Sequence, residues 1–148
     1  MNAAAVPLLL ALLAGVLLAI QAPTNAILGK AGGSAVMAAF VSFLVGSLAL
    51  GAATLASSGR LFAPGLRQVP WYAWVGGLYG AVFVAVAAYA APRIGVGVLL
   101  TAAVAGQLAA AVVLDHFGLL GLARHPATIT RIAGILLVFV GAWLVRRG

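Results

Sequence analysis

The stretch AAVPLLLALLAGVLLAIQAPTNAIL, residues 4–28, contains no charged residue and is apolar over most of its length. A transmembrane helix needs about 20 mostly apolar residues, within a range of about 17–25. Four further segments of the chain meet the same criterion, at about residues 34–56, 71–91, 95–114 and 129–145. The sequence therefore predicts an all-α integral membrane protein with five transmembrane helices.

The composition of the chain supports this prediction. Of 148 residues, 66% are hydrophobic and only 6% are charged, whereas a soluble domain carries roughly 25% charged residues. The length suits one domain, so we expect a single five-helix membrane domain over residues 1–148. There is no cysteine, which excludes disulfides and thiolate metal sites.

The first span also has the length of a signal peptide, so this alternative has to be considered. A signal peptide begins with a positively charged region, and no Lys or Arg precedes residue 4. Gln21, Pro23 and Asn25 give the span a polar end that favours a structural role. We expect a retained transmembrane helix.

The net charge of +7 comes from eight basic residues and one acid. The basic residues are distributed between the apolar segments, as loop charges of a membrane protein are, and not as a nucleic-acid-binding patch. With five spans the termini lie on opposite sides of the membrane. The N-terminal side then carries Arg60, Arg67, Arg124 and Arg131, and the other side carries Lys30, Arg93, Arg146 and Arg147.

This four-to-four balance gives no preferred orientation, because orientation normally follows an excess of Lys and Arg on the cytoplasmic side. One interpretation is that a single loop dominates and the balance is accidental. The other is that the chain inserts both ways and pairs with an antiparallel copy of itself. Such a pair is equivalent to the inverted repeats from which many transporters are built.

Four short motifs connect the sequence with a known family: residues 21–26 (QAPTNA), 41–46 (VSFLVG), 105–108 (AGQL) and 114–121 (LDHFGLLG). Arg131 and Gly134 follow in the same order. With these motifs, over nearly its whole length, the chain resembles the DUF606 or YdcZ family of small five-helix bacterial proteins, within the drug/metabolite transporter superfamily.

The resemblance implies that the five helices are half of a ten-helix inverted-repeat transporter fold in the bacterial inner membrane. It implies an antiparallel second copy, or a homologous chain, as the partner. Members of the family occur singly, as gene pairs and as fused repeats. The family supplies no assured substrate.

Polar side chains within the spans are candidates for a solute-binding site, because polar groups are costly in hydrocarbon. Gln21 and Asn25 share one face of the first span. Tyr79 and Gln107 lie near the middle of the third and fourth spans, and Ser42 lies in the second. Each of these residues has an alternative role in hydrogen bonding between or within helices.

Asp115 is the only acid and adjoins His116 at the end of the fourth span. The small multidrug resistance proteins of the superfamily carry a glutamate in their first helix, and this chain has none. Proton coupling would need Asp115, a histidine, or no carboxylate. Alternatively, Asp115 pairs with Arg124 or Arg131 and tethers the loop between the last two spans, and this structural role is our expectation.

Gly134 and Gly141 are seven residues apart on one face of the fifth span. This spacing resembles the seam between subunits in small multidrug resistance proteins, so we expect a dimer contact there. The chain lacks paired carboxylates and the common catalytic and nucleotide-binding motifs. We therefore expect no enzyme, no metal and no cofactor.

These features predict a membrane transporter, an exporter of a small organic solute that works as an antiparallel dual-topology homodimer. The lack of buried charge slightly favours neutral or zwitterionic solutes. The alternatives are a non-transporting membrane scaffold or regulatory subunit, and a passive channel. The short loops speak against a scaffold, and the scarcity of polar residues speaks against a channel.

Overall fold

The computed structural model of the protein describes residues 5–147, without the side chains of Pro64 and Arg67, and this part of the chain consists of helices and the loops between them, without strands. Its elements are α1 (Ala5–Ala31), α2 (Ala35–Ser58), the 3₁₀ helices η1 (Pro64–Gln68) and η2 (Trp71–Val75), α3 (Gly76–Ile94), α4 (Val96–Phe117), η3 (Leu119–Gly121) and α5 (Ile129–Arg147). The described helices include five that are long and apolar enough to cross a membrane, which confirms the predicted fold class.

Residues of known capping preference mark the ends of several helices. Ser34 precedes α2, and its Oγ accepts a hydrogen bond from the backbone N–H of Met37 at 3.3 Å, as an N-cap does. Gly59 and Gly118 end α2 and α4 in the left-handed conformation, with φ of 68° and 63°. These local signals explain why the helix boundaries follow the sequence closely.

The third and fourth spans differ in detail from the sequence prediction. The third begins with a 3₁₀ turn, and its α-helix then passes through Pro92 to Ile94. A proline this close to a helix end is tolerated because only one hydrogen bond of the last turns is lost. The fourth helix ends after Phe117, so Asp115 and His116 belong to its last turn.

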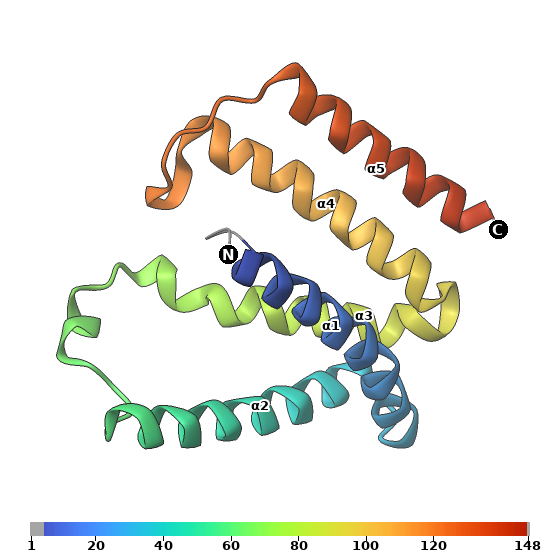
Figure 1. The fold of residues 1–148 in the computed structure, drawn as a ribbon. Coiled ribbons are helices and arrows are strands. Elements are labelled where there is room, and N and C mark those ends of the chain that lie inside the picture. The colour runs from blue at the N-terminus through green and yellow to red at the C-terminus, as the bar shows by residue number, and fades with distance from the viewer. Residues whose placement is uncertain (1–4, 148) are drawn as a thin grey trace. The chain divides into compact units, whose positions relative to one another are not determined.

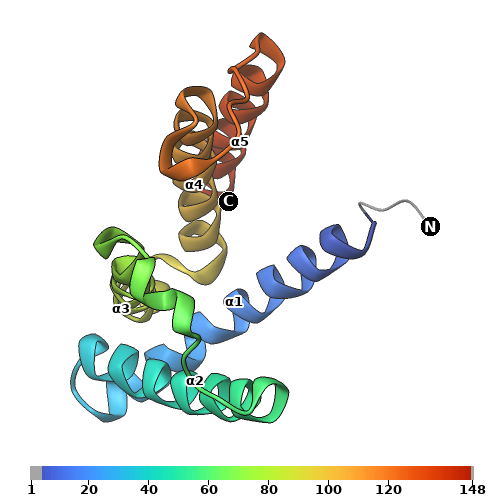
Figure 2. The same ribbon diagram turned by 90° about the vertical axis from the view of Figure 1, so that its left-hand side faces the viewer.

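The contacts within the chain divide it into two compact units, one ending at Arg93 and one beginning at Ile94. In the first unit α1 and α2 form an antiparallel pair, and in the second α4 and α5 do the same (Figure 1). Figure 2 shows both pairs from the side. The connection between α1 and α2 is short, residues 32–34, as is usual for antiparallel neighbours, whereas α4 and α5 are joined by the longer segment 118–128, which includes η3.

Small residues form the contact between α1 and α2. A Cβ added to Gly29 would lie 3.4 Å from the carbonyl oxygen of Ser34 and 3.5 Å from the Cβ of Ala38. Ala22 lies on the same face of α1 as Gly29 and is buried, and Ala38 and Ala39 on α2 are buried as well. Close approach through Gly and Ala is typical of helix packing in membranes.

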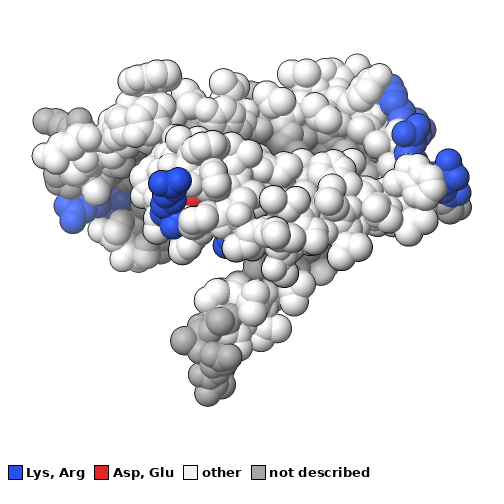
Figure 3. Space-filling view, turned by 90° about the horizontal axis from the view of Figure 1, so that it is seen from above, with Lys and Arg blue, Asp and Glu red and all other residues white. Residues whose placement is uncertain are grey.

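Large apolar side chains cover the outside of both units. Leu17, Ile27 and Leu48 are 66%, 73% and 67% exposed, and no described residue of α5 is buried. On the face drawn in Figure 3 the basic side chains are confined to a few places, one of them beside an acidic side chain, and the rest of the surface carries no charge. Lipid, or another protein surface within the membrane, must cover this apolar area.

We predict that Gly29→Leu destabilises the protein, because its side chain must separate α1 from α2. Overpacking of this kind costs about 1–3 kcal/mol. Gly15→Leu is the matched control on the same helix, since an added Cβ at Gly15 has no neighbour within 4 Å. Thermal unfolding in detergent, followed by tryptophan fluorescence, measures both variants. Equal midpoints would show that the close contact of α1 with α2 is not required.

Candidate functional site

Asn25 is the one polar residue that is buried among the residues the structure describes. It is only 5% exposed, and its side-chain Nδ2 has no hydrogen-bond partner among them. Asn25 is four residues before Gly29 and therefore lies on the face of α1 that contacts α2. The amide donor is thus enclosed at a helix–helix contact.

The surroundings of Asn25 on α1 are polar and contain a break in the hydrogen-bond ladder. Pro23 lies inside the helix and has no N–H to donate to the carbonyl one turn earlier. Thr24 donates from its hydroxyl to the carbonyl of Ile20 at 2.8 Å, so its polar group is satisfied locally. Gln21 is half-buried one turn before Asn25. Gln21 and Asn25 therefore remain on one face, as the spacing predicted.

Ser42 lies on α2, four residues after Ala38, and is half-buried. It therefore shares the α2 face that contacts α1. The hydroxyls of Thr54 and Thr101 each donate a hydrogen bond to the carbonyl four residues earlier. The hydroxyl of Ser42 makes no such hydrogen bond within residues 5–147. Its hydroxyl is the nearest polar counterpart of Asn25 by helix register.

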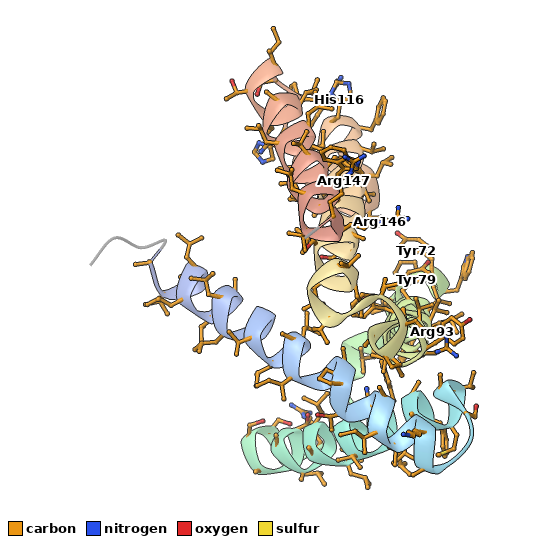
Figure 4. The ribbon with its side chains drawn as sticks, turned by 90° about the vertical axis from the view of Figure 1, so that its right-hand side faces the viewer. Tyr72, Tyr79, Arg93, His116, Arg146 and Arg147 are labelled. Atoms are coloured by element: carbon orange, nitrogen blue, oxygen red, sulfur yellow. The ribbon has the colours of Figure 1, made fainter. Side chains whose placement is uncertain are left out.

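Tyr79 projects from α3 and is 68% exposed (Figure 4). The neighbouring Gly80 lets α3 approach α2, since an added Cβ would lie 3.1 Å from Cζ of Phe43. Beside this contact is a groove of about 400 Å³ between the two helices. The groove is lined by Val36, Ala39, Phe40, Phe43, Ala81, Val82 and Ala85. Because its lining is apolar, the groove suits a lipid chain or an apolar side chain rather than a polar solute.

Gln107 is exposed on α4, in the second unit of the chain. The structure thus brings Gln21, Asn25 and Ser42 to one helix pair and leaves Tyr79 and Gln107 on open helix faces. A cavity shared by these residues stays a prediction that concerns the assembled protein.

Asp115 forms an ion pair with Arg131, with 3.3 Å between Oδ2 and Nη1. Arg131 is one of the two cationic partners expected from the sequence. The side chains are 32% and 43% exposed, respectively. The pair connects the last turn of α4 with the first turn of α5.

Backbone and side-chain hydrogen bonds fold the loop between α4 and α5 over the same helix end. The carbonyl of Asp115 accepts from the N–H of His125 at 2.8 Å. Nδ1 of His116 accepts from the N–H of Ala127 at 3.0 Å, and Arg124 Nε donates to the carbonyl of His116 at 3.0 Å. Asp115 and His116 are therefore placed to hold a loop.

Gly134 and Gly141 leave open surface on α5. A Cβ added to either residue would have no neighbouring atom within 4 Å, so neither glycine makes a close contact within residues 5–147. The dimer contact expected at these positions remains a proposal.

Two cation–π contacts anchor helix ends and were not expected from the sequence. The guanidinium of Arg93 lies 3.6 Å from the ring centre of Tyr89, and that of Arg147 lies 4.0 Å from the ring of Trp143. Figure 4 shows Arg93 at the end of α3 and Arg147 at the end of α5. The spacing of four residues was the available signal, because it places both side chains on one helix face.

We predict that Asp115→Asn and Arg131→Gln each lower the thermal stability modestly and that the double variant loses less than the sum. Partly exposed pairs contribute about 0.2–1 kcal/mol, and the backbone bond from His125 keeps the loop in place without the carboxylate. A double-mutant cycle by thermal unfolding measures the coupling. Additive losses would contradict the ion pair.

The comparisons with known proteins agree with this architecture. Residues 6–144 match the model of a family described as "Putative inner membrane exporter, YdcZ". Neither the curated proteins nor the solved structures give a match. The match covers nearly the whole chain and includes all five membrane helices. The chain therefore belongs to the YdcZ family, and it is a multi-pass protein of the inner membrane.

Proposed function

We propose that this membrane transporter exports a small organic solute and works as an antiparallel homodimer of two identical five-helix chains. Asn25 carries the proposal, because its amide is enclosed in the membrane region without a partner among the described residues. Unsatisfied polar groups are costly in hydrocarbon and mark functional sites more often than chance. In the proposed dimer, Gln21, Asn25, Tyr79 and Gln107 line a solute pathway, and Ser42 contributes to it.

The homodimer is supported by the charge balance and by the open helix faces. Four basic residues lie on each side of the predicted membrane, so either orientation is equally favoured. A Cβ added to Gly134 or Gly141 would meet no atom of the described residues within 4 Å, and Tyr79 is largely exposed. A second, inverted copy that covers these faces would give the pseudo-two-fold arrangement of transporters.

The proposed cycle is alternating access between two nearly equivalent states. Because the two subunits are identical, exchange of their conformations converts an inward-open dimer into an outward-open one. Asp115 is paired with Arg131 near a helix end, so it is not the proposed solute ligand. Solutes recognised by Gln, Asn and Tyr side chains bind through hydrogen bonds and aromatic contact, without a counter-charge.

We predict that liposomes containing the protein take up at least one solute from a panel of sugars, amino acids and organic cations. Gln107→Leu should lower this flux at least tenfold with little change in thermal stability, because the glutamine is exposed on α4. Leu108→Ala, at the next position, is the matched control. Flux equal to that of empty liposomes for every solute, with folded protein, would contradict the proposed export.

Asp115→Asn should keep its response to an imposed proton gradient, since the carboxylate is placed to pair with Arg131. The same liposomes, with and without the gradient, provide the measurement. If the folded variant still bound the transported solute but lost all proton-driven flux, Asp115 would be the proton carrier and the tethering role would be wrong.

We predict dual topology for the protein in cells. Reporter domains fused to the C-terminus, one active only in the cytoplasm and one only outside it, should both be active. Replacement of Arg60 and Arg124 by Gln removes charge from one side only, so it should shift the population towards one orientation. A single orientation of the unmodified protein would exclude the antiparallel homodimer.

A further inference from the structure

We propose that the contact between α1 and α2 opens to water at Asn25, and that the freed amide donates a hydrogen bond to the transported solute. This inference rests on the proposed transport function and deepens it, because it names the residue that moves from an enclosed to an accessible state. It also names the solute chemistry: an oxygen that accepts hydrogen bonds, in a carbonyl, hydroxyl or carboxylate group.

Asn25 is enclosed at the contact between α1 and α2, and its Nδ2 has no hydrogen-bond partner among the described residues. A buried amide whose Nδ2 has no partner lowers the stability of the state that contains it. Polar side chains on exposed parts of the helices do have partners, as the hydroxyls of Thr24, Thr54 and Thr101 show. An unpartnered donor at this contact is therefore better explained as one that is satisfied in another conformation.

The contact between α1 and α2 also consists of residues that favour its separation. Ala22, Gly29, Ala38 and Ala39 form it, and small side chains bring little dispersion energy to a contact. Pro23, two residues before Asn25, lacks the N–H that would fasten this turn of α1 to the preceding one. A helix bends most readily where such a bond is missing. The end of α1 is joined to α2 by residues 32–34, so a bend at Pro23 swings the part of α1 before the proline away from α2 and uncovers the contact from Ala22 towards Asn25.

Opening of the contact between α1 and α2 would expose neutral polar groups. Asn25 Nδ2 would face outward together with the half-buried side chains of Gln21, on the same helix, and Ser42, on α2. These three groups are neutral, and the amide nitrogens are donors only. An acceptor oxygen of the solute satisfies Asn25 directly, and no charge on the solute is required.

The absence of cysteine from the sequence permits a direct test, since one introduced cysteine is the only reactive thiol. Asn25→Cys in lipid nanodiscs is treated with a cationic, water-soluble methanethiosulfonate reagent and analysed by intact-mass spectrometry. Ile27→Cys is the matched control, because Ile27 is 73% exposed on the opposite face of α1 and its thiol would lie in lipid. Arg60→Cys, in the loop after α2, is the positive control.

We expect Asn25→Cys to be modified at least tenfold faster than Ile27→Cys, because only an aqueous opening lets the thiol ionise and react. Equal, slow modification of both would show that the contact stays closed, and it would overturn the proposal. This readout does not depend on a known solute. If position 25 is modified while the wild-type protein carries no member of the solute panel, opening stands and the proposed transport fails.

A second experiment separates solute contact from helix–helix hydrogen bonding. Asn25→Ala should leave the thermal midpoint unchanged or raise it, since it removes an unpartnered amide, and it should reduce flux of the solute carried by the wild type at least tenfold. Asn25→Asp, which replaces the donor by an acceptor, should reduce that flux equally. A fall in the thermal midpoint of Asn25→Ala, or unchanged flux, would show that the amide does not act on the solute.

Discussion

Hydrocarbon offers no hydrogen-bond partners, and every polar group in the membrane has to find one within the protein. The backbone meets this constraint by forming five helices of membrane-spanning length. The side chains meet it by being almost entirely apolar, with Thr hydroxyls turned back onto their own helices. Asn25 is the exception, because its amide is enclosed and unpartnered among residues 5–147. The proposed transport function is based on this exception.

The apolar surroundings also determine which residues form the contact between α1 and α2. In water, burial of large apolar side chains would hold the helices together, but lipid is as apolar as leucine and provides no such driving force. The contact between α1 and α2 therefore uses close approach at Gly29 and Ala38. Most leucines, such as Leu17 and Leu48, remain outside, where they meet lipid or a second copy.

Much of the fold could be predicted because membrane spans and helix ends have local signals. Apolar length indicated the five spans, and Ser34 and Gly118 mark helix ends by well-known preferences. The pairing of Asp115 with a cation was also predictable, since the chain has one acid and two basic residues near it. The third span was predicted to end at residue 91, before Pro92, but the helix continues to Ile94, because a proline near the end of a helix does not have to end it.

The candidate site was less predictable, because it depends on contacts between helices. The sequence placed Gln21 and Asn25 on one face, but it did not indicate that Asn25 alone would be enclosed. Nor did the sequence indicate Gly29 as a contact residue, although its lack of a side chain brings α1 onto α2. Tyr79 and Gln107 lie on exposed helix faces, so their role depends on a partner that no single-chain pattern specifies.

The central claim is that two inverted copies of this chain enclose one solute pathway. A structure of the assembled protein in lipid nanodiscs tests it most directly. The account predicts two chains of opposite orientation, with Asn25, Tyr79 and Gln107 around a common cavity near the membrane midplane. Two chains of the same orientation, or these side chains facing lipid in the assembly, would contradict it.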